Sequence, residues 1–272
     1  MRPPSPNDRF ELALFATDLA VVRQAVAGGV EAVVVDWESE GKEARQASHD
    51  TEINRHTVAD LRAARTATRA RLLCRINCFG ARTAQEVEQA LAAGADELLL
   101  PMVRSPAEVE SVLVLADGRS GVGILVETRA AVEVAAELAR LPVSRVYVGL
   151  NDLAIERGTP SIFAPLADGL LDELRERFAA VRFGFGGLTL PEAGSPLPCR
   201  LLVAEIARLR ADFTFLRRSF YRDVAGRDVA REVPRILAAL AAARQRPTEE
   251  EERDRSELLA RLLPRATQAA LA

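Results

Sequence analysis

Short apolar runs alternate along the chain with longer amphipathic stretches. The apolar runs are rich in Leu and β-branched residues, as are the strands of a buried parallel sheet. Eight of them occur, at residues 11–17, 30–38, 70–77, 96–103, 121–128, 145–152, 181–189 and 212–219. The stretches between them have helical spacing of apolar residues, and several open on Ser, Thr or Asp and close on Gly.

Eight strand–helix units in succession predict a (β/α)8 TIM barrel, for which roughly 250 residues is the usual size. A doubly wound open sheet is the alternative fold. That fold normally carries a glycine-rich phosphate loop after its first strand, and the segment ALFATDLA at residues 13–20 contains no glycine. We therefore expect a barrel that occupies residues 1–245.

Residues 246–272 follow a different pattern. Thr248 and Glu251 fit a capping box, and an apolar stripe follows at Leu258, Leu259, Leu262 and Leu263. The pattern predicts a C-terminal helical extension beyond the barrel. Its stripe needs a covering surface, which is either the chain's own barrel or a neighbouring subunit.

Composition excludes several classes of protein. The chain has 272 residues, of which 49% are hydrophobic and 28% charged, and its net charge of -3 offers no basic field for nucleic acid. The N-terminus MRPPSPNDRF lacks an apolar core, and no apolar run approaches the ~18 residues of a membrane span. We expect a cytoplasmic protein. Its three cysteines indicate neither a disulfide framework nor a zinc site.

Polar residues end several of the predicted strands, where the chemistry of a barrel of this type is located. Asp36 and Glu38 end the second strand and share one face of it, as Arg75 and Asn77 do at the end of the third. Glu127 and Asp152 end the fifth and sixth strands. Because those strands are neighbours, we expect these two side chains to form a carboxylate pair.

Two carboxylates at one barrel mouth repel each other unless a cation lies between them. An all-oxygen site with few protein ligands suits Mg²⁺ or Mn²⁺, which keep positions open for water and substrate. We therefore predict that Glu127 and Asp152 bind such a metal. The alternative for Asp152 is that it only caps the turn after its strand, and Gly149 is expected to leave space there for substrate or a neighbouring backbone.

The order of the segments DWE, RIN, GADELLLPMV, ILVET and VGLNDLA resembles the HpcH/HpaI aldolase and citrate lyase β-subunit family, which are barrels of the phosphoenolpyruvate/pyruvate-binding superfamily. The resemblance implies that Glu127 and Asp152 are the metal-binding carboxylates. It implies that Arg75 binds the carboxylate or carbonyl oxygen of an oxo acid, and that Asp36 is the first acid of the family's D-x-E segment. It also implies oligomers with exchanged C-terminal helices, and we expect a homo-oligomer, a trimer or a hexamer.

One departure from the family concerns the group that moves a proton. The aldolase branch has a histidine after D-x-E and the citrate lyase branch has an aspartate, whereas this chain has Ser39. Candidates for the base are therefore Glu38, His49, His56 or a metal-bound hydroxide. We assign catalysis to Arg75, Asp36 and Glu38, the alternative for Glu38 being a supporting contact to Arg75 or Asp36.

Other residues at the predicted strand ends are candidates for substrate binding. We expect contacts to the substrate from Arg75, Asn77, Pro101, Met102 and Asn151. Arg217 and Arg218 end the eighth strand, close to where many barrels bind phosphate. Either they orient an anionic substrate or they form ion pairs.

These residues predict a divalent-metal-dependent carbon–carbon lyase or aldolase. Its substrate would be a small hydroxy or oxo acid, or an acyl-CoA ester, cleaved through a metal-stabilised enolate. Decarboxylation, thioester hydrolysis or condensation on the same scaffold is the first alternative. A non-catalytic barrel subunit is the second.

Overall fold

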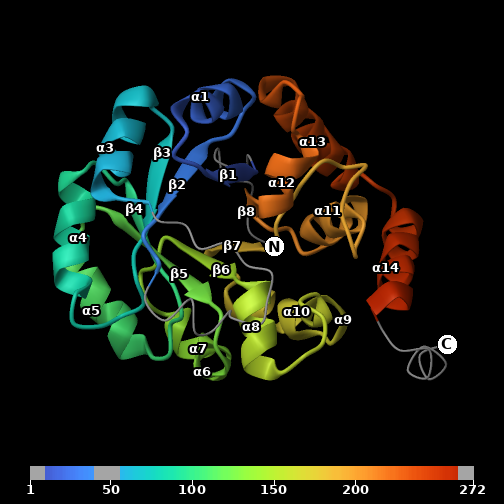
Figure 1. The fold of residues 1–272 in the computed structure, drawn as a ribbon. Helices are drawn as coiled ribbons and strands as arrows, with labels where there is room; N and C mark the ends of the chain where they lie inside the picture. The colour runs from blue at the N-terminus through green and yellow to red at the C-terminus, as the bar shows by residue number, and fades with distance from the viewer. Residues whose placement is uncertain (1–9, 40–55, 263–272) are drawn as a thin grey trace.

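A closed barrel of eight parallel strands forms the centre of the molecule in the computed structural model, which describes residues 10–39 and 56–262. The strands follow chain order around the barrel, and β8 closes it by pairing with β1, Glu11 lying opposite Phe213. The predicted TIM barrel is therefore confirmed (Figure 1). The strands are β1 Glu11–Phe15, β2 Ala32–Asp36, β3 Arg71–Arg75, β4 Glu97–Leu100, β5 Gly121–Val126, β6 Arg145–Val148, β7 Arg182–Phe185 and β8 Phe213–Leu216.

Helices surround the barrel on its outside (Figure 1). Their starts follow the predicted capping residues, because Asp18 accepts hydrogen bonds from two amides of α1 and Ser105 accepts one from α5. The helices are α1 Leu19–Ala27, α3 Val58–Ala67, α4 Thr83–Ala92, α5 Pro106–Ala116, α6 Arg129–Glu133, α7 Ala135–Leu138, α8 Leu150–Arg157, α9 Ala164–Ala167, α10 Leu170–Arg177, α11 Cys199–Arg208, α12 Arg218–Asp223, α13 Val229–Ala243 and α14 Thr248–Leu262.

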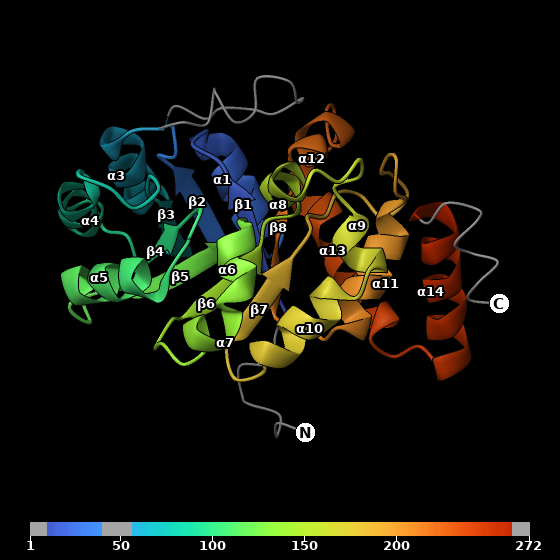
Figure 2. The same ribbon diagram turned by 90° about the horizontal axis from the view of Figure 1, so that it is seen from below.

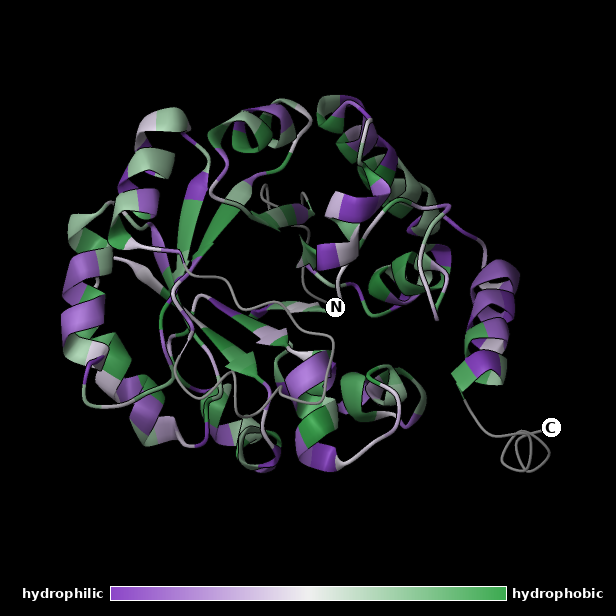
Figure 3. Cartoon of the chain, viewed as in Figure 1, coloured by the Kyte–Doolittle hydropathy of each residue, from purple (hydrophilic) through white to green (hydrophobic). Residues whose placement is uncertain are grey.

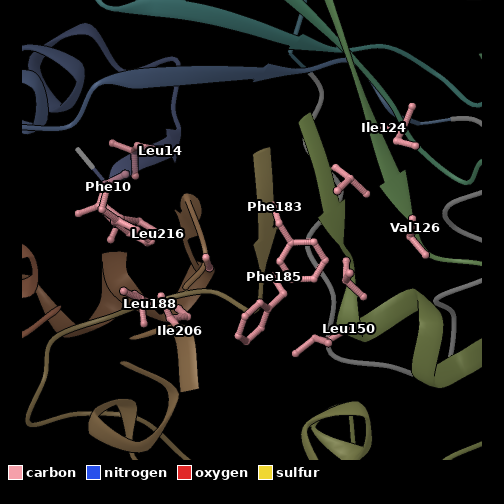
Figure 4. Packing of buried hydrophobic residues seen from close by; sticks show 14 of the residues in the cluster. Phe10, Leu14, Ile124, Val126, Leu150, Phe183, Phe185, Leu188, Ile206 and Leu216 are labelled. Atoms are coloured by element: carbon pink, nitrogen blue, oxygen red, sulfur yellow. The ribbon is translucent and has the colours of Figure 1, made fainter. Parts of the chain in front are cut away.

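Side-chain alternation along the strands divides the core into two layers. Val33 and Val35 of β2 belong to the outer layer against the helices, whereas Val34 belongs to a smaller cluster inside the barrel. Figure 4 shows part of the outer layer, including Phe183 and Phe185 of β7. Because both faces of each strand are buried, the middles of the strands are hydrophobic, as the green colouring in Figure 3 shows, while charged residues stand at strand ends such as that of β2.

Ion pairs fill the barrel at the end where the strands begin. Arg145, the first residue of β6, is 1% exposed and donates two hydrogen bonds to Glu97 (2.6 and 2.7 Å) and one to Glu11 (2.5 Å). Its guanidinium also lies over the Phe213 ring, 4.6 Å from the centroid. The charges are thus paired within the barrel at this end, and the opposite end is the one that carries a cavity.

The C-terminal helix α14 packs on the same chain. Leu258 is fully buried, and Arg255 donates hydrogen bonds to the Leu166 carbonyl (2.6 Å) and to Glu205 (2.9 Å). Figure 2 shows α14 beside α11 at the edge of the molecule. Part of the predicted apolar stripe is therefore covered within the chain, while Leu263 lies outside the described residues. The homo-oligomer stays a prediction.

None of the helices in the described part of the chain combines the length and apolar character that crossing a membrane requires. Cys74, Cys78 and Cys199 are all free thiols, and the sequence predicts no disulfide framework.

Candidate active site

A cavity of about 580 Å³ opens at the end of the barrel where the strands end. Its wall comes from β1, β3, β5, β6 and β8, from the segments that follow β1 and β5 to β8, and from the segment before α3. In Figure 2 the arrows of β2 and β7 point toward the side on which α8 and α12 lie. The lining includes Phe15, His56, Arg75, Glu127, Tyr147, Asn151, Asp152, Phe215 and Arg217.

Arg75 is fixed at the end of β3 by two buried carboxylates. It donates two hydrogen bonds to Asp36 (2.7 and 2.8 Å), and its Nη1 lies 3.2 Å from Glu38. Burial alone would lower the pKa of Arg75, but the two carboxylates outweigh this effect, and the net result is a pKa above the usual value. Three of its five N–H groups face the two carboxylates, which leaves two for a ligand in the cavity.

Asp36 and Glu38 are placed behind Arg75. Asp36 is 0% and Glu38 2% exposed, and neither is among the described residues that line the cavity. Their position fits the supporting contact that was the alternative for Glu38. Glu38 lies two residues beyond the end of β2, so both acids reach Arg75 although only Asp36 is in the strand, where the register of β2 with β3 sets it directly opposite Arg75.

Glu127 and Asp152 both line the cavity, as the sequence predicts. Burial is the main cause that raises the pKa of Glu127 to about 8. The charges of Asp152 and Glu38 add to it, while Arg75 and the Met102 amide oppose it. A carboxyl group with that pKa holds a proton near neutral pH unless a cation offsets the repulsion. This donor set therefore fits a divalent cation bound by hard oxygen ligands.

The segment after β6 differs from the predicted strand. The strand ends at Val148, and α8 begins at Leu150 with Gly149 as its N-cap. Asp152 is thus in the first turn of a helix and not at the end of a strand. A Cβ added at Gly149 would lie only 2.4 Å from Cγ and Oε1 of Glu127. The space that Gly149 leaves is consequently filled by the Glu127 side chain.

Three residues predicted to bind substrate are not among the described residues that line the cavity. Asn77 donates to Glu86 (2.7 Å) and accepts from the Ser39 amide (2.9 Å), so that its side chain holds neighbouring loops. Pro101 and Met102 are buried, and the Met102 amide donates to Glu127 (3.1 Å). All three residues follow the observed ends of β3 and β4, and for Asn77 the strand alternation used to orient it no longer applies there. Arg75 and Asn151 do line the cavity.

His56 is the candidate base that the structure brings to the cavity wall. Its Nδ1 accepts a hydrogen bond from the Asp36 amide (3.0 Å). Because an amide can only donate, Nδ1 of His56 acts as the acceptor in this contact. The role of His56 as a base stays a prediction. His49 lies outside the described residues.

Sequence reasoning missed the aromatic floor of the site. Tyr147 on β6 lies 4.3 Å from Phe215 on β8, measured between ring centroids, and both rings line the cavity. Burial, followed by the charge of Glu127, raises the pKa of Tyr147 well above its usual range. Strand alternation could have identified Tyr147, because it stands two residues before Gly149 and therefore shares its strand face. In the structure Tyr147 belongs to the cluster inside the barrel.

Solved structures with the same fold cover most of the chain. The protein CitE from Mycobacterium tuberculosis, in complex with magnesium and pyruvate, is 18% identical with a TM-score of 0.57, over 94% of this chain and 100% of that one. Citrate synthase SbnG is 16% identical with a TM-score of 0.59, over 81% and 92%. RipC from Yersinia pestis is 14% identical with a TM-score of 0.56, over 90% and 99%.

No curated protein matches the sequence. The model of the HpcH/HpaI aldolase/citrate lyase family does match it, over residues 11–162. This segment contains Arg75 and the Glu127–Asp152 pair. Since the match extends over more than half of the sequence, the chain belongs to the HpcH/HpaI aldolase/citrate lyase family.

Proposed function

We propose that this protein is a divalent-metal-dependent carbon–carbon lyase or aldolase that acts on a small hydroxy or oxo acid, or on its acyl thioester. The observation that carries the proposal is one cavity that Arg75, Glu127 and Asp152 line together. It combines a held guanidinium with two converging carboxylates. CitE, which has the same fold, was solved in complex with magnesium and pyruvate, and this supports a divalent metal and an oxo acid as the ligands of the present cavity.

Glu127 and Asp152 would hold the cation, Mg²⁺ or Mn²⁺. Within residues 10–39 and 56–262, no group of three or more His, Cys, Asp or Glu side chains is arranged to bind a metal. Two carboxylates with the remaining positions open to water and substrate are the kind of site that Mg²⁺ occupies. When bound, the cation would stabilise the negative charge that develops as the carbon–carbon bond breaks and an enolate forms.

Arg75 would bind an oxygen of the reacting oxo acid with the two N–H groups that its carboxylate partners leave over. Asp36 and Glu38 fix the plane of the guanidinium before substrate arrives, which lowers the cost of ordering it. Phe15 packs against the same group, its ring centroid 5.0 Å from Arg75 Cζ.

The test is to incubate the protein with hydroxy-oxo acids and acyl-CoA esters in the presence of Mg²⁺ or Mn²⁺, and to identify products by mass spectrometry. Glu127→Gln and Asp152→Asn should abolish turnover and weaken metal binding, while the exposed Glu133→Gln serves as the matched control. Release of carbon dioxide or of free coenzyme A, without carbon–carbon cleavage, would replace a lyase by another enolate reaction. Unchanged metal affinity in both site variants would refute the site.

A further inference from the structure

Glu86 is a buried carboxylate to which the proposed reaction assigns no part. It lies in the first turn of α4 and is 7% exposed. It accepts hydrogen bonds from both the backbone amide (2.9 Å) and the side-chain amide (2.7 Å) of Asn77, whereas the exposed Arg82 contacts it only at 3.5 Å. Burying a carboxylate costs free energy unless hydrogen bonds compensate it, and the short ones here come from Asn77.

Asn77 extends this constraint to the segment after β2. Its side-chain nitrogen donates to the Glu86 carboxylate, and its side-chain oxygen accepts a hydrogen bond from the Ser39 amide (2.9 Å). The orientation of the Asn77 amide is fixed, because an ionised carboxylate can only accept and a backbone N–H can only donate. Glu86 thus holds the segments that follow β2 and β3 together through one side chain.

These two segments carry the two partners of one ion pair. Arg75 ends β3, two residues before Asn77. Glu38 directly precedes Ser39, and its Oε2 lies 3.2 Å from Nη1 of Arg75. Asp36 accepts from Nε and Nη2 of the guanidinium, so Glu38 is the acid that engages Nη1. The position of Glu38 therefore decides how Nη1 is shared between this carboxylate and a ligand in the cavity.

We propose that Glu86 is a positioning residue that acts through Asn77 on the guanidinium of Arg75. The inference rests on the proposed function, in which Arg75 binds an oxygen of the oxo acid. Loss of the Glu86 carboxylate would release the segment after β2 and let Glu38 turn away from Nη1. A guanidinium that is held less firmly binds the oxo acid less tightly, because more of its ordering is left to the ligand.

The test uses pyruvate as the probe, titrated calorimetrically in the presence of saturating Mn²⁺. Glu86→Gln keeps the size of the side chain but replaces one acceptor by a donor, so that one of the two hydrogen bonds from Asn77 is lost. We expect this variant to bind pyruvate about tenfold more weakly than the wild-type protein does, at the low end of what the loss of a supporting contact costs. Glu88→Gln is the matched control, because Glu88 lies on the same helix and is 59% exposed.

Mn²⁺ affinity, measured without pyruvate, should stay within about twofold in Glu86→Gln, because the carboxylates Glu127 and Asp152 come from other segments of the barrel. A double-mutant cycle then separates positioning from a general loss of stability. If Glu86 acts through Arg75, Glu86→Gln should weaken pyruvate binding less than about twofold in a protein that already carries Arg75→Lys. A merely destabilised loop would lower the affinity by the same factor in both backgrounds.

Asn77→Ala breaks the chain of contacts one step closer to Arg75 and should show the same loss and the same coupling, so either folded variant decides the question. Unchanged pyruvate affinity, equal losses in both backgrounds, a tenfold loss of Mn²⁺ affinity, or failure of both variants to fold would each overturn the positioning role and spare the proposed function. Failure of pyruvate and other oxo acids to bind the wild-type protein with Mn²⁺ would overturn both.

Discussion

Gly149→Ala is the sharpest test of how the candidate metal site is built. The new Cβ would lie 2.4 Å from both Cγ and Oε1 of Glu127 and 2.8 Å from its Cδ. Contacts between such atoms are comfortable near 3.5 Å, so the Glu127 carboxylate has to move by roughly 1 Å. The backbone needs no change, because φ of -82° at Gly149 is open to alanine. The substitution therefore acts on the position of one carboxylate.

A displacement of that size at a ligand should lower the affinity for Mg²⁺ or Mn²⁺ by roughly tenfold to a hundredfold. It should also lower turnover by about a hundredfold once a substrate is known. The free energy of unfolding should change little, since alanine restricts the unfolded chain by about 0.4–1 kcal/mol and so offsets part of the crowding. Calorimetric titration with Mn²⁺ and thermal unfolding measure the two effects separately.

Gly80→Ala is the matched control, because a Cβ there meets only the Cys78 carbonyl oxygen at 3.8 Å. It should bind metal like the wild-type protein. If Gly149→Ala retained full metal affinity with an unchanged melting temperature, Glu127 would not be a ligand held in the observed position. The assignment of the carboxylate pair would then have to be given up.

Three further substitutions test other parts of the structure. Arg75→Lys should keep the fold and the bound metal but lose about 3 kcal/mol of transition-state stabilisation, which lowers the rate more than a hundredfold. The reason is that an ammonium group cannot bond to Asp36 and to a ligand in one plane. Near-normal turnover of this variant would refute the role of Arg75. Ser39→Ala should keep more than about a tenth of turnover, a cost below ~1.4 kcal/mol, so a folded, metal-loaded but inactive variant would make Ser39 catalytic. Arg145→Ala should lower the free energy of unfolding by about 3–5 kcal/mol in urea titrations, whereas the exposed Arg119→Ala should barely change it; equal effects would contradict a buried ion-pair role.

The order of elements could be predicted from the sequence because each strand is short, apolar and separated from the next by a helical repeat. The ends of the strands could not. Leu150 continues the apolar run of β6 although it is the first residue of α8, so hydrophobicity does not change where the backbone turns. Asp152 was therefore identified as a site residue but assigned to the wrong element.

For the candidate site too, some features could be predicted from the sequence and others could not. The placement of Arg75, Glu127 and Asp152 at the cavity could be predicted because their polar character interrupts an apolar pattern at a predictable place. The pairing of Asn77 with Glu86 depends on how the loop after β3 folds back onto α4, and no periodicity encodes it. His56 and Arg217 show the same limit, since their contacts, or the lack of them, depend on segments distant in the sequence.

The charged cluster at the opposite end of the barrel makes the two halves of the chain dependent on each other. Glu11 and Glu97 lie in the first half, while Arg145, 134 residues beyond Glu11, lies in the second. A fragment that stops before β6 would keep the half-exposed Arg71 as a partner of Glu97 (2.7 Å) but would lose Arg145, the buried cation that pairs with both carboxylates. A fragment that starts at β6 would hold Arg145 without Glu11 and Glu97. This barrel is therefore a poor candidate for division into half-barrels that fold independently. We expect its two halves to fold and unfold together as one cooperative unit.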